Sequence, residues 1–333
     1  MSLCLLAGCK NQTPDGEYAR PGDTGLGATR RTTLVKRGEA AYRLHCIGCH
    51  GAEGDGKGEA AKFFKPSPRN FVAANFKFSS TRSGRLPTDD DLRRTITHGL
   101  RGSAMPPFKL LPNATVDALI AYIKTFSPKW KERQPASPVP FVDDPYRSEP
   151  DKSEAVARGE MIYHGYATCW TCHPAYLSPD GINAARKAVG FQLYESFREN
   201  LHQSVGKENI EGEVIFPPDF ERDSVRAGSR VQDLYRSIAA GITGTAMPTW
   251  VDSIEVPGPT PDAPPLVQPS DLWAVAYYVK SLIEQRPARL PEDRITLRTN
   301  RRRAIYLHGE PPKPEAPPEP EEETGEPADF GFD

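Results

Sequence analysis

Two five-residue stretches carry side chains with the types and spacing needed for covalent chemistry, CIGCH at 46–50 and CWTCH at 169–173. Both are C-x-x-C-H, the pattern of c-type haem attachment. On one helical turn the two thiols lie on one face, where they can bond the two haem vinyl groups, and the histidine follows on that face and can reach the iron. The pattern predicts haem thioethers at Cys46, Cys49, Cys169 and Cys172, and proximal iron ligands at His50 and His173.

Paired cysteines can also form a zinc site or a redox dithiol. A Cys4 zinc site does not require histidine directly after each second cysteine, and here the two pairs begin 123 positions apart. A thioredoxin-like dithiol normally lies in a βαβ unit, and this sequence does not predict such a unit. Covalent haem therefore remains the favoured chemistry at both stretches.

The second axial position on each iron decides between an electron carrier and a catalyst. Of the four methionines, Met105 and Met247 lie in matching segments, GSAMPPF (102–108) and GTAMPTW (244–250). The small residues let the backbone pass close to a macrocycle, and the following proline favours an extended backbone at methionine. A thioether ligand raises the reduction potential and favours electron transfer. The alternatives are that both methionines fill core space, or that His98 and His202 are the ligands.

The surroundings of the two haem motifs recur along the chain, which indicates an internal duplication. Each repeated block has apolar residues at helical spacing and predicts a helix; in the middle block, Thr88 and Gly99 suit an N-cap and a C-cap. An all-α fold follows. The matched blocks are VKRGEAAYRLHCIGCH (35–50) with VARGEMIYHGYATCWTCH (156–173, two residues longer), DLRRTITHGLRGSAMPPF (91–108) with DLYRSIAAGITGTAMPTW (233–250), and VDALIAYIKTF (116–126) with LWAVAYYVKSL (272–282).

On these motifs the chain resembles class I c-type cytochromes in tandem, over about 35–130 and 155–285. The resemblance implies two covalently bound haem c groups, each wrapped by three helices, with His50 and Met105 on one iron and His173 and Met247 on the other. It also implies that a proline-rich loop offers a carbonyl to each proximal histidine. Candidates for that loop are Pro66 and Pro68 in KPSPRNF and Pro217 and Pro218 in FPPDF, with simple turn rigidity as the alternative; Arg69, Arg82 and Arg226 are candidates for the haem propionates or are solvated surface residues.

The composition and the matched blocks together predict five segments. These are a lipoprotein-like signal and linker (1–30), a first cytochrome c domain (31–130), a proline-rich linker (131–152), a second cytochrome c domain (153–287), and an arginine-rich segment with an acidic, proline-rich, disordered tail (288–333). The tail either docks a basic partner or is simply solvated. An insertion at 180–212 has no counterpart in the first unit, and we expect helix around its FQLYESFRENL stretch.

Charge and hydropathy restrict the partners. The net charge of −2 gives no basic footprint for nucleic acid, and no apolar stretch approaches the roughly 18 residues of a membrane-spanning helix. Leu6-Ala7-Gly8-Cys9 resembles a bacterial lipobox, which would make Cys9 the lipidated first residue of the mature protein, although only eight residues precede it and none of them is basic. A frayed apolar terminus is the alternative.

These observations predict a diheme electron carrier in the bacterial cell envelope, on the periplasmic side and lipid-anchored to the membrane. It would pass electrons between respiratory-chain proteins and would not be an enzyme with a small-molecule substrate. Two alternatives stay open. One is a diheme cytochrome c peroxidase or related haem enzyme with one open iron; the other is a docking subunit of a membrane respiratory complex.

Overall fold

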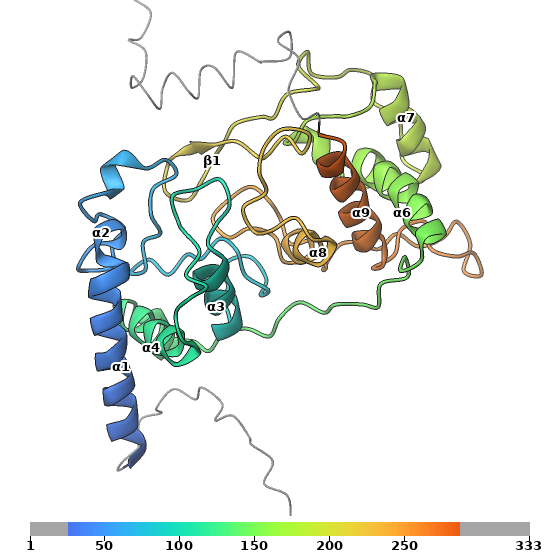
Figure 1. Ribbon diagram of the computed structural model, residues 1–333. Coiled ribbons are helices and arrows are strands. Elements are labelled where there is room, and N and C mark those ends of the chain that lie inside the picture. The colour runs from blue at the N-terminus through green and yellow to red at the C-terminus, as the bar shows by residue number, and fades with distance from the viewer. Residues whose placement is uncertain (1–25, 287–333) are drawn as a thin grey trace, which may run out of the picture. The chain divides into compact units, whose positions relative to one another are not determined.

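The computed structural model describes residues 26–286, and within them it is mostly helical (Figure 1). The predicted lipidation site at Cys9 and the predicted tail at 288–333 lie outside these residues. The first half has the elements α1 (Leu26–His45), α2 (Ile47–His50), η1 (Ala61–Phe63), α3 (Asp89–His98), α4 (Asn113–Ile123), η2 (Lys124–Phe126) and α5 (Lys129–Glu132).

The second half repeats this order with additions. Its elements are α6 (Glu149–Met161), the π-helical turn η3 (Ile162–Tyr166), η4 (Cys169–Thr171), α7 (Pro179–Ala188), α8 (Val231–Ala240) and α9 (Asp271–Glu284). Strands β1 (Lys207–Glu208) and β2 (Val214–Ile215) pair antiparallel, with Lys207 opposite Ile215. Helix α1 starts five residues before the expected domain boundary at 31, and α6 starts within the expected linker.

A glycine in each half lets two helices cross closely. In Figure 1, α1 lies against α4 and α6 lies against α9. A Cβ atom on Gly38 would lie 1.9 Å from the carbonyl oxygen of Ala118, and one on Gly159 would lie 2.0 Å from that of Ala274. The repeated Arg-Gly-Glu run therefore marks the crossing of the first and last helix in each half.

Helix α3 has the predicted ends. The Thr88 hydroxyl accepts a hydrogen bond from the Asp91 N–H at 3.2 Å, and the Asp91 carboxylate accepts one from the Thr88 N–H at 3.0 Å. This capping box satisfies two backbone donors that the helix cannot pair itself. Gly99 ends the helix at φ 64°, a left-handed backbone angle that favours glycine.

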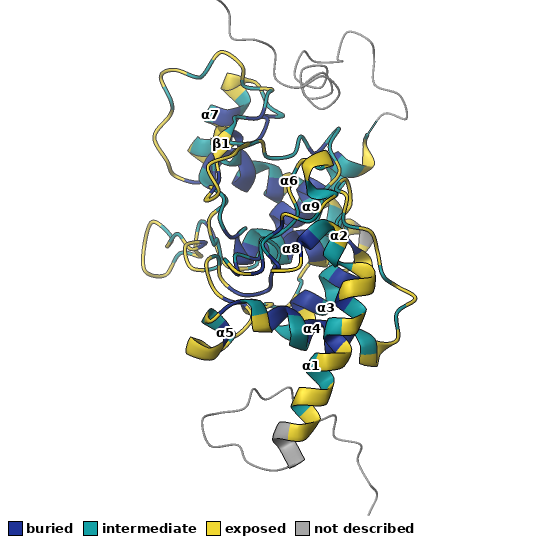
Figure 2. Ribbon diagram, turned by 90° about the vertical axis from the view of Figure 1, so that its left-hand side faces the viewer, coloured by how far each residue is buried: buried dark blue, intermediate teal, exposed yellow. Residues whose placement is uncertain are grey.

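Each half has its own hydrophobic cluster, drawn in dark blue in Figure 2. The first centres on Tyr42, Phe71, Phe76, Leu92, Ile96, Val116, Leu119, Ile123 and Trp130. The second includes Tyr163, Trp170, Phe220, Leu234, Tyr235, Leu272, Trp273 and Tyr278. The repeated blocks thus supply the buried faces in both halves.

The two extra residues before CWTCH change the helix that leads into it. After α6 the backbone widens into the π-helical turn η3, and Thr168 then takes a left-handed conformation at φ 44°. Inserted residues in helices are commonly absorbed as such π-turns. Tyr163 and Cys169 therefore occupy the positions in the second hydrophobic cluster that Tyr42 and Cys46 occupy in the first.

The expectation of helix around 191–201 is wrong, because this stretch has no helix and the helix of the insertion is α7 instead. The backbone of Tyr194 is engaged elsewhere: its N–H donates to Asn183 Oδ1 at 2.9 Å, and its carbonyl accepts from Asn183 Nδ2 at 3.1 Å. Its ring meets that of Trp170 edge to face, with the ring centres 5.4 Å apart. These pairings between distant residues replace the bonds that a helix would make within itself.

Direct hydrogen bonds join the two halves. The N–H groups of Ser83 and Gly84 donate to the Ala240 carbonyl at 2.9 Å and to the Thr243 hydroxyl at 3.0 Å. Beside them, the Arg82 guanidinium pairs with the Asp252 carboxylate through three contacts of 2.7 to 3.0 Å. The loop that precedes α3 therefore contacts the segment between α8 and α9.

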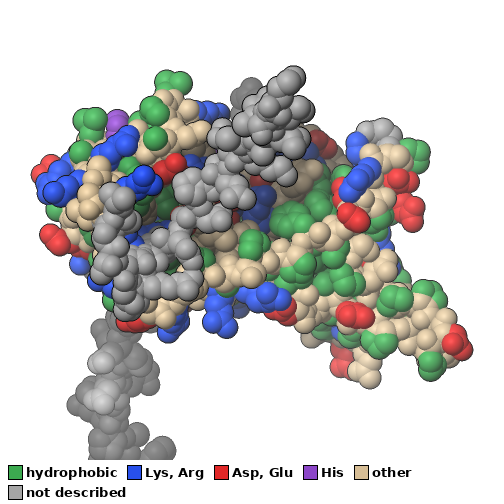
Figure 3. Space-filling view, turned by 90° about the horizontal axis from the view of Figure 1, so that it is seen from below, with side chains coloured by type: hydrophobic (Ala, Val, Ile, Leu, Met, Phe, Trp, Pro, Cys, Tyr) green, Lys and Arg blue, Asp and Glu red, His purple; other side chains and the backbone are tan. Residues whose placement is uncertain are grey.

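On the face shown in Figure 3, Lys and Arg side chains are interspersed with Asp and Glu, with hydrophobic atoms between them. Among the described helices, none combines the length and the apolar character that crossing a bilayer requires.

Candidate haem-binding sites

One cavity in the first half collects the predicted donor groups. Cys46, Cys49 and His50, at the junction of α1 and α2, line it together with Met105 from the loop after α3. The other walls are largely apolar and include Phe64, Phe71, Phe76, Leu92, Ile96, Leu100, Phe108 and Ile123. Two thiols, an imidazole and a thioether inside apolar walls fit a covalently attached, apolar macrocycle with an iron centre.

The two histidines predicted as proximal ligands have fixed orientations. His50 is buried, and its Nδ1 lies 3.0 Å from the Arg69 carbonyl oxygen. Since a carbonyl can only accept, Nδ1–H donates and Nε2 keeps its lone pair for a metal. Burial lowers the pKa of His50, which favours this neutral form. His50 also stacks on Phe71, with ring centres 4.4 Å apart and an interplanar angle of 19°.

The second half repeats this arrangement. His173 Nδ1 lies 3.0 Å from the Pro218 carbonyl, and its ring stacks on Phe220 at 4.8 Å and 17°. The predicted loops thus supply the carbonyls: Pro218 was among the candidates, whereas in the first half the acceptor is Arg69 and not Pro66 or Pro68. The stacked phenylalanines were missed, although each stands two residues after the residue whose carbonyl accepts the histidine hydrogen bond, in Arg-Asn-Phe and Pro-Asp-Phe.

The two methionine loops have the same hydrogen bonds. In the first, the Leu100 N–H donates to the Met105 carbonyl at 3.1 Å, the Met105 N–H donates to Ser103 Oγ at 3.2 Å, and Ser103 Oγ donates to the Leu100 carbonyl at 2.7 Å. Each loop is closed on itself, so the backbone of its methionine is fixed. The hydroxyl at 103 was not singled out from the sequence, although Ser and Thr alternate there between the repeats.

The second methionine loop has an equivalent of each of these three hydrogen bonds. The Ile242 N–H donates to the Met247 carbonyl at 3.2 Å, the Met247 N–H donates to Thr245 Oγ1 at 3.1 Å, and Thr245 Oγ1 donates to the Ile242 carbonyl at 2.8 Å. Gly241 enters the loop at φ 75°, as Gly99 does at φ 64°. Met105 and Met247 therefore occupy equivalent, half-buried positions.

A buried tyrosine supports each haem motif from the preceding helix. The Tyr42 hydroxyl donates to the carbonyl of Gly51 at 2.7 Å, and the Tyr163 hydroxyl donates to that of Pro174 at 2.9 Å. Gly51 and Pro174 each follow the proximal histidine directly. These bonds fasten the end of each C-x-x-C-H turn to the helix that leads into it.

The two cysteine pairs belong to different hydrophobic clusters, with Cys46 on the first and Cys169 on the second. Burial raises the pKa of both thiols to about 12. Within residues 26–286, no three or more His, Cys, Asp or Glu side chains are grouped so that they could hold a metal ion. A Cys4 zinc site, which would need both pairs together, does not fit this arrangement.

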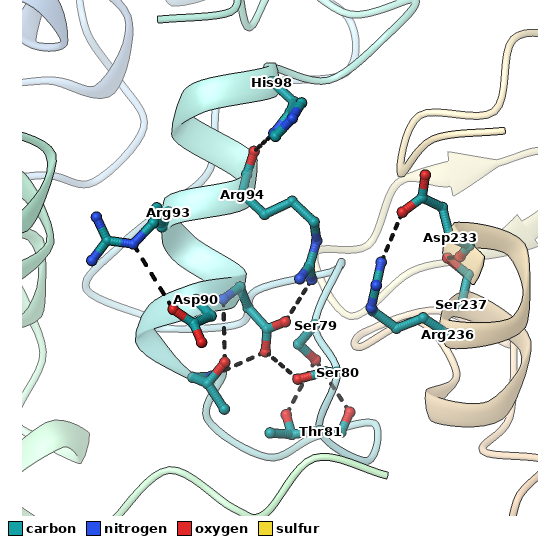
Figure 4. Close-up of polar contacts among 12 residues, drawn as sticks. Ser79, Ser80, Thr81, Asp90, Arg93, Arg94, His98, Asp233, Arg236 and Ser237 are labelled. Atoms are coloured by element: carbon teal, nitrogen blue, oxygen red, sulfur yellow. Dashed lines mark hydrogen bonds and ion pairs between the residues drawn. The ribbon is translucent and has the colours of Figure 1, made fainter. Parts of the chain in front are cut away.

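The rival histidine ligands lie elsewhere. His98 is exposed, and its Nδ1 lies 3.0 Å from the Arg94 carbonyl one turn earlier in α3 (Figure 4). His202 is also exposed. Neither residue lines the cavity that contains His50.

The three candidate arginines differ in their surroundings. Arg82 pairs with Asp252 across the junction of the halves, and Arg69 contacts Glu211. Arg226 belongs to the second half yet lines the cavity of the first. Arg69 lines this cavity as well, whereas Arg82 does not, so the cavity supports the predicted contact with a propionate at the first site for Arg69 and Arg226.

Comparison with known proteins agrees with this geometry. The family model of the cbb3-type cytochrome c oxidase subunit III matches residues 33–123. A chain in the solved structure of the reducing HAO-like protein complex of Kuenenia stuttgartiensis is 28% identical; the alignment covers 74% of this chain and 96% of that one, with a TM-score of 0.57. No curated protein matches. A cytochrome c domain carries covalently bound haem c and acts in electron transfer, and residues 33–123 of this chain are similar to the class I c-type cytochrome domain of the cbb3-type family.

Proposed function

We propose that the chain is a two-haem electron-transfer protein, with cytochrome c domains at 31–130 and 153–287. One haem is attached at Cys46 and Cys49 and the other at Cys169 and Cys172. The observation that carries this proposal is the duplicated set of bonds: a carbonyl on each histidine Nδ1, a stacked phenylalanine, and a self-closed methionine loop.

Within each domain the residues have separate tasks. The carbonyl on Nδ1 fixes the tautomer and the ring of His50 or His173, which leaves the lone pair of Nε2 available and would let it bind a haem iron. The methionine loop presents a thioether from a fixed backbone. The apolar walls exclude water, which limits solvent rearrangement when the charge of the site changes. The bound haem itself supplies a one-electron couple between ferrous and ferric iron.

A methionine in each domain favours electron transfer over the alternative of a peroxidase or related haem enzyme. Such an enzyme needs an iron position open to its substrate. Here Met105 and Met247 are held by the same bonds, so both irons have a protein thioether available. The proposal therefore assigns no catalytic residue to the chain.

For the partner, we propose a redox protein to which this chain is bound in a complex at the periplasmic face of a bacterial membrane. The similar solved chain belongs to a reducing HAO-like protein complex, and Leu6-Ala7-Gly8-Cys9 supports a lipid anchor at Cys9. Extraction of membranes with mild detergent tests this part: co-purification with a redox enzyme supports it, whereas release as a free protein favours a diffusing carrier.

Spectroscopy with single substitutions tests the haem assignment. Intact mass should show two covalent haems, and the ferric protein should show two low-spin haems with the far-red band of sulfur ligation. Met105→Ala should convert one haem to high spin and leave the other unchanged, because it removes one thioether; Met247→Ala should convert the other.

A matched control is Met161→Ala, in α6 and away from both loops, which should change neither haem. An unchanged spectrum in Met105→Ala would mean that Met105 fills core space and does not bind iron. A high-spin haem in the unmodified protein would favour the peroxidase-like alternative.

A further inference from the structure

The second half has a long insertion between its haem motif and the carbonyl on its proximal histidine. His50 and Arg69 are 19 residues apart, whereas His173 and Pro218 are 45 apart. The function proposed above leaves this insertion unexplained. One of its arginines, Arg198, contacts the CWTCH turn directly.

The Arg198 side chain reaches several carbonyl oxygens at once. Its Nη2 lies 3.0 Å from the Trp170 carbonyl and 3.2 Å from the His173 carbonyl, both in the haem motif. The same nitrogen lies 2.9 Å from the Leu201 carbonyl and 2.8 Å from that of Gln203, within the insertion. Its two hydrogens are thus shared among four acceptors, which joins the insertion to the turn.

The charge of Arg198 has no carboxylate partner among residues 26–286: no ion pair there includes it, and its hydrogen bonds there go to backbone carbonyls. Its Nε atom is buried, and no hydrogen-bond partner for it lies among residues 26–286. An arginine stays protonated in proteins. A positive charge that no carboxylate within residues 26–286 pairs with therefore lies next to the CWTCH turn.

The first half satisfies the corresponding carbonyls with neutral donors. There the Gly51 N–H donates to the Ile47 carbonyl at 2.9 Å, and the Gly56 N–H donates to the His50 carbonyl at 2.9 Å. Ile47 and His50 correspond to Trp170 and His173 in the repeat. In the first half, backbone amides of the glycine-rich loop at 51–58 therefore donate to these carbonyls, whereas in the second half the Arg198 cation donates to them.

We propose that Arg198 is a positioning residue that holds the CWTCH turn and raises the reduction potential of the second haem relative to the first. This inference rests on the proposed two-haem function. The ferric form of a site carries one more positive charge than the ferrous form, so a nearby cation disfavours oxidation. With other influences equal, one electron moves from the ferrous first site to the ferric second site, which oxidises the first and reduces the second without a proton.

The test is a redox titration of the full chain, followed in the visible spectrum, with three variants. Arg198→Gln removes the charge and should lower the midpoint potential of one of the two one-electron transitions. The expected shift is about tenfold in the equilibrium constant, or about 59 mV, and the midpoint of the other transition should not move. Arg198→Lys keeps the charge and should leave both transitions near their original positions.

Arg186→Gln is the matched control. Arg186 lies in the same insertion and donates to the carbonyls of Gln192 at 2.7 Å and Gly165 at 3.1 Å, neither in the haem motif. Its loss removes the same charge from the same segment and should move neither transition. A shift as large as that of Arg198→Gln would overturn the inference.

The other outcomes are also decisive. An unmoved or raised transition in Arg198→Gln overturns the inference while leaving the two-haem function intact. If Arg198→Gln loses its second haem, Arg198→Lys is the deciding variant. An Arg198→Lys protein that keeps both haems at their original midpoint potentials supports the inference, and a tenfold shift in either equilibrium constant refutes it. An unmodified protein without two transitions contradicts the proposed function itself, and the inference with it.

Discussion

Replacing Gly38 by alanine should destabilise the first half, although alanine normally favours helices. The new Cβ would lie 1.9 Å from the Ala118 carbonyl oxygen and 2.8 Å from the Tyr122 Cβ. An ordinary carbon–oxygen contact is about 3.3 Å, and the obstructing atom belongs to the backbone of α4, which cannot rotate away. Helices α1 and α4 must therefore separate by more than about 1 Å.

The magnitude follows from two opposed effects. Alanine gains up to about 1 kcal/mol over glycine within a helix. A separation of about 1 Å forfeits a quarter to a half of the dispersion energy between facing atoms, and overpacked cores lose about 1–3 kcal/mol and occasionally more. Since the clash here is with backbone, we expect Gly38→Ala to lower the free energy of unfolding by about 2 kcal/mol net.

Urea unfolding of the haem-loaded chain, followed by circular dichroism, measures this effect. The matched control is Gly48→Ala in α2, where an added Cβ would meet nothing within 4 Å; it should be neutral or stabilising by about 0.5 kcal/mol. The close-crossing argument fails if Gly38→Ala is as stable as the unmodified chain, or if both variants change stability alike.

Three further substitutions test other parts of the structure by the same urea unfolding. Thr88→Ala removes half of the capping box of α3 and should cost about 1 kcal/mol; an unchanged stability would mean that the cap contributes nothing. Tyr163→Phe leaves the Pro174 carbonyl without its hydroxyl donor and should cost about 1–2 kcal/mol, and a cost near zero would show that another donor replaces it. Burial lowers the pKa of His164 to about 4 from an ordinary 6.5, so between these pH values the unfolded chain binds a proton that the folded chain does not. The free energy of unfolding should thus fall by up to about 3 kcal/mol as the pH drops from 6.5 to 4, a dependence that His164→Gln should remove; equal slopes in both proteins would refute this assignment.

The local pattern of the sequence was sufficient to predict several of the helices. Apolar spacing predicted the helices that became α3, α4 and α9, and Thr88 and Gly99 predicted the ends of α3. In each case the information lies within a few residues of the element, in its caps and its periodicity. The same holds for the methionine loops, whose bonds join residues at most five positions apart.

Contacts between distant residues were harder to predict. The carbonyl on His50 belongs to Arg69 and not to a neighbouring proline, because the loop path sets which oxygen faces the ring. The stretch 191–201 has helix-like composition yet no helix, because Asn183 engages the backbone of Tyr194. Periodicity carries no information about such partners.

By itself, the sequence determined the duplicated haem motifs, the mostly helical character and the two methionines at equivalent positions, since each depends on residue type and short spacing. Only the tertiary structure decided that Met105 shares a cavity with His50, that Gly38 and Gly159 let helices cross, and that Arg198 lies against the second haem motif. These depend on where the folded chain brings together atoms that are far apart in sequence, and the free energy of packing the whole core selects that arrangement.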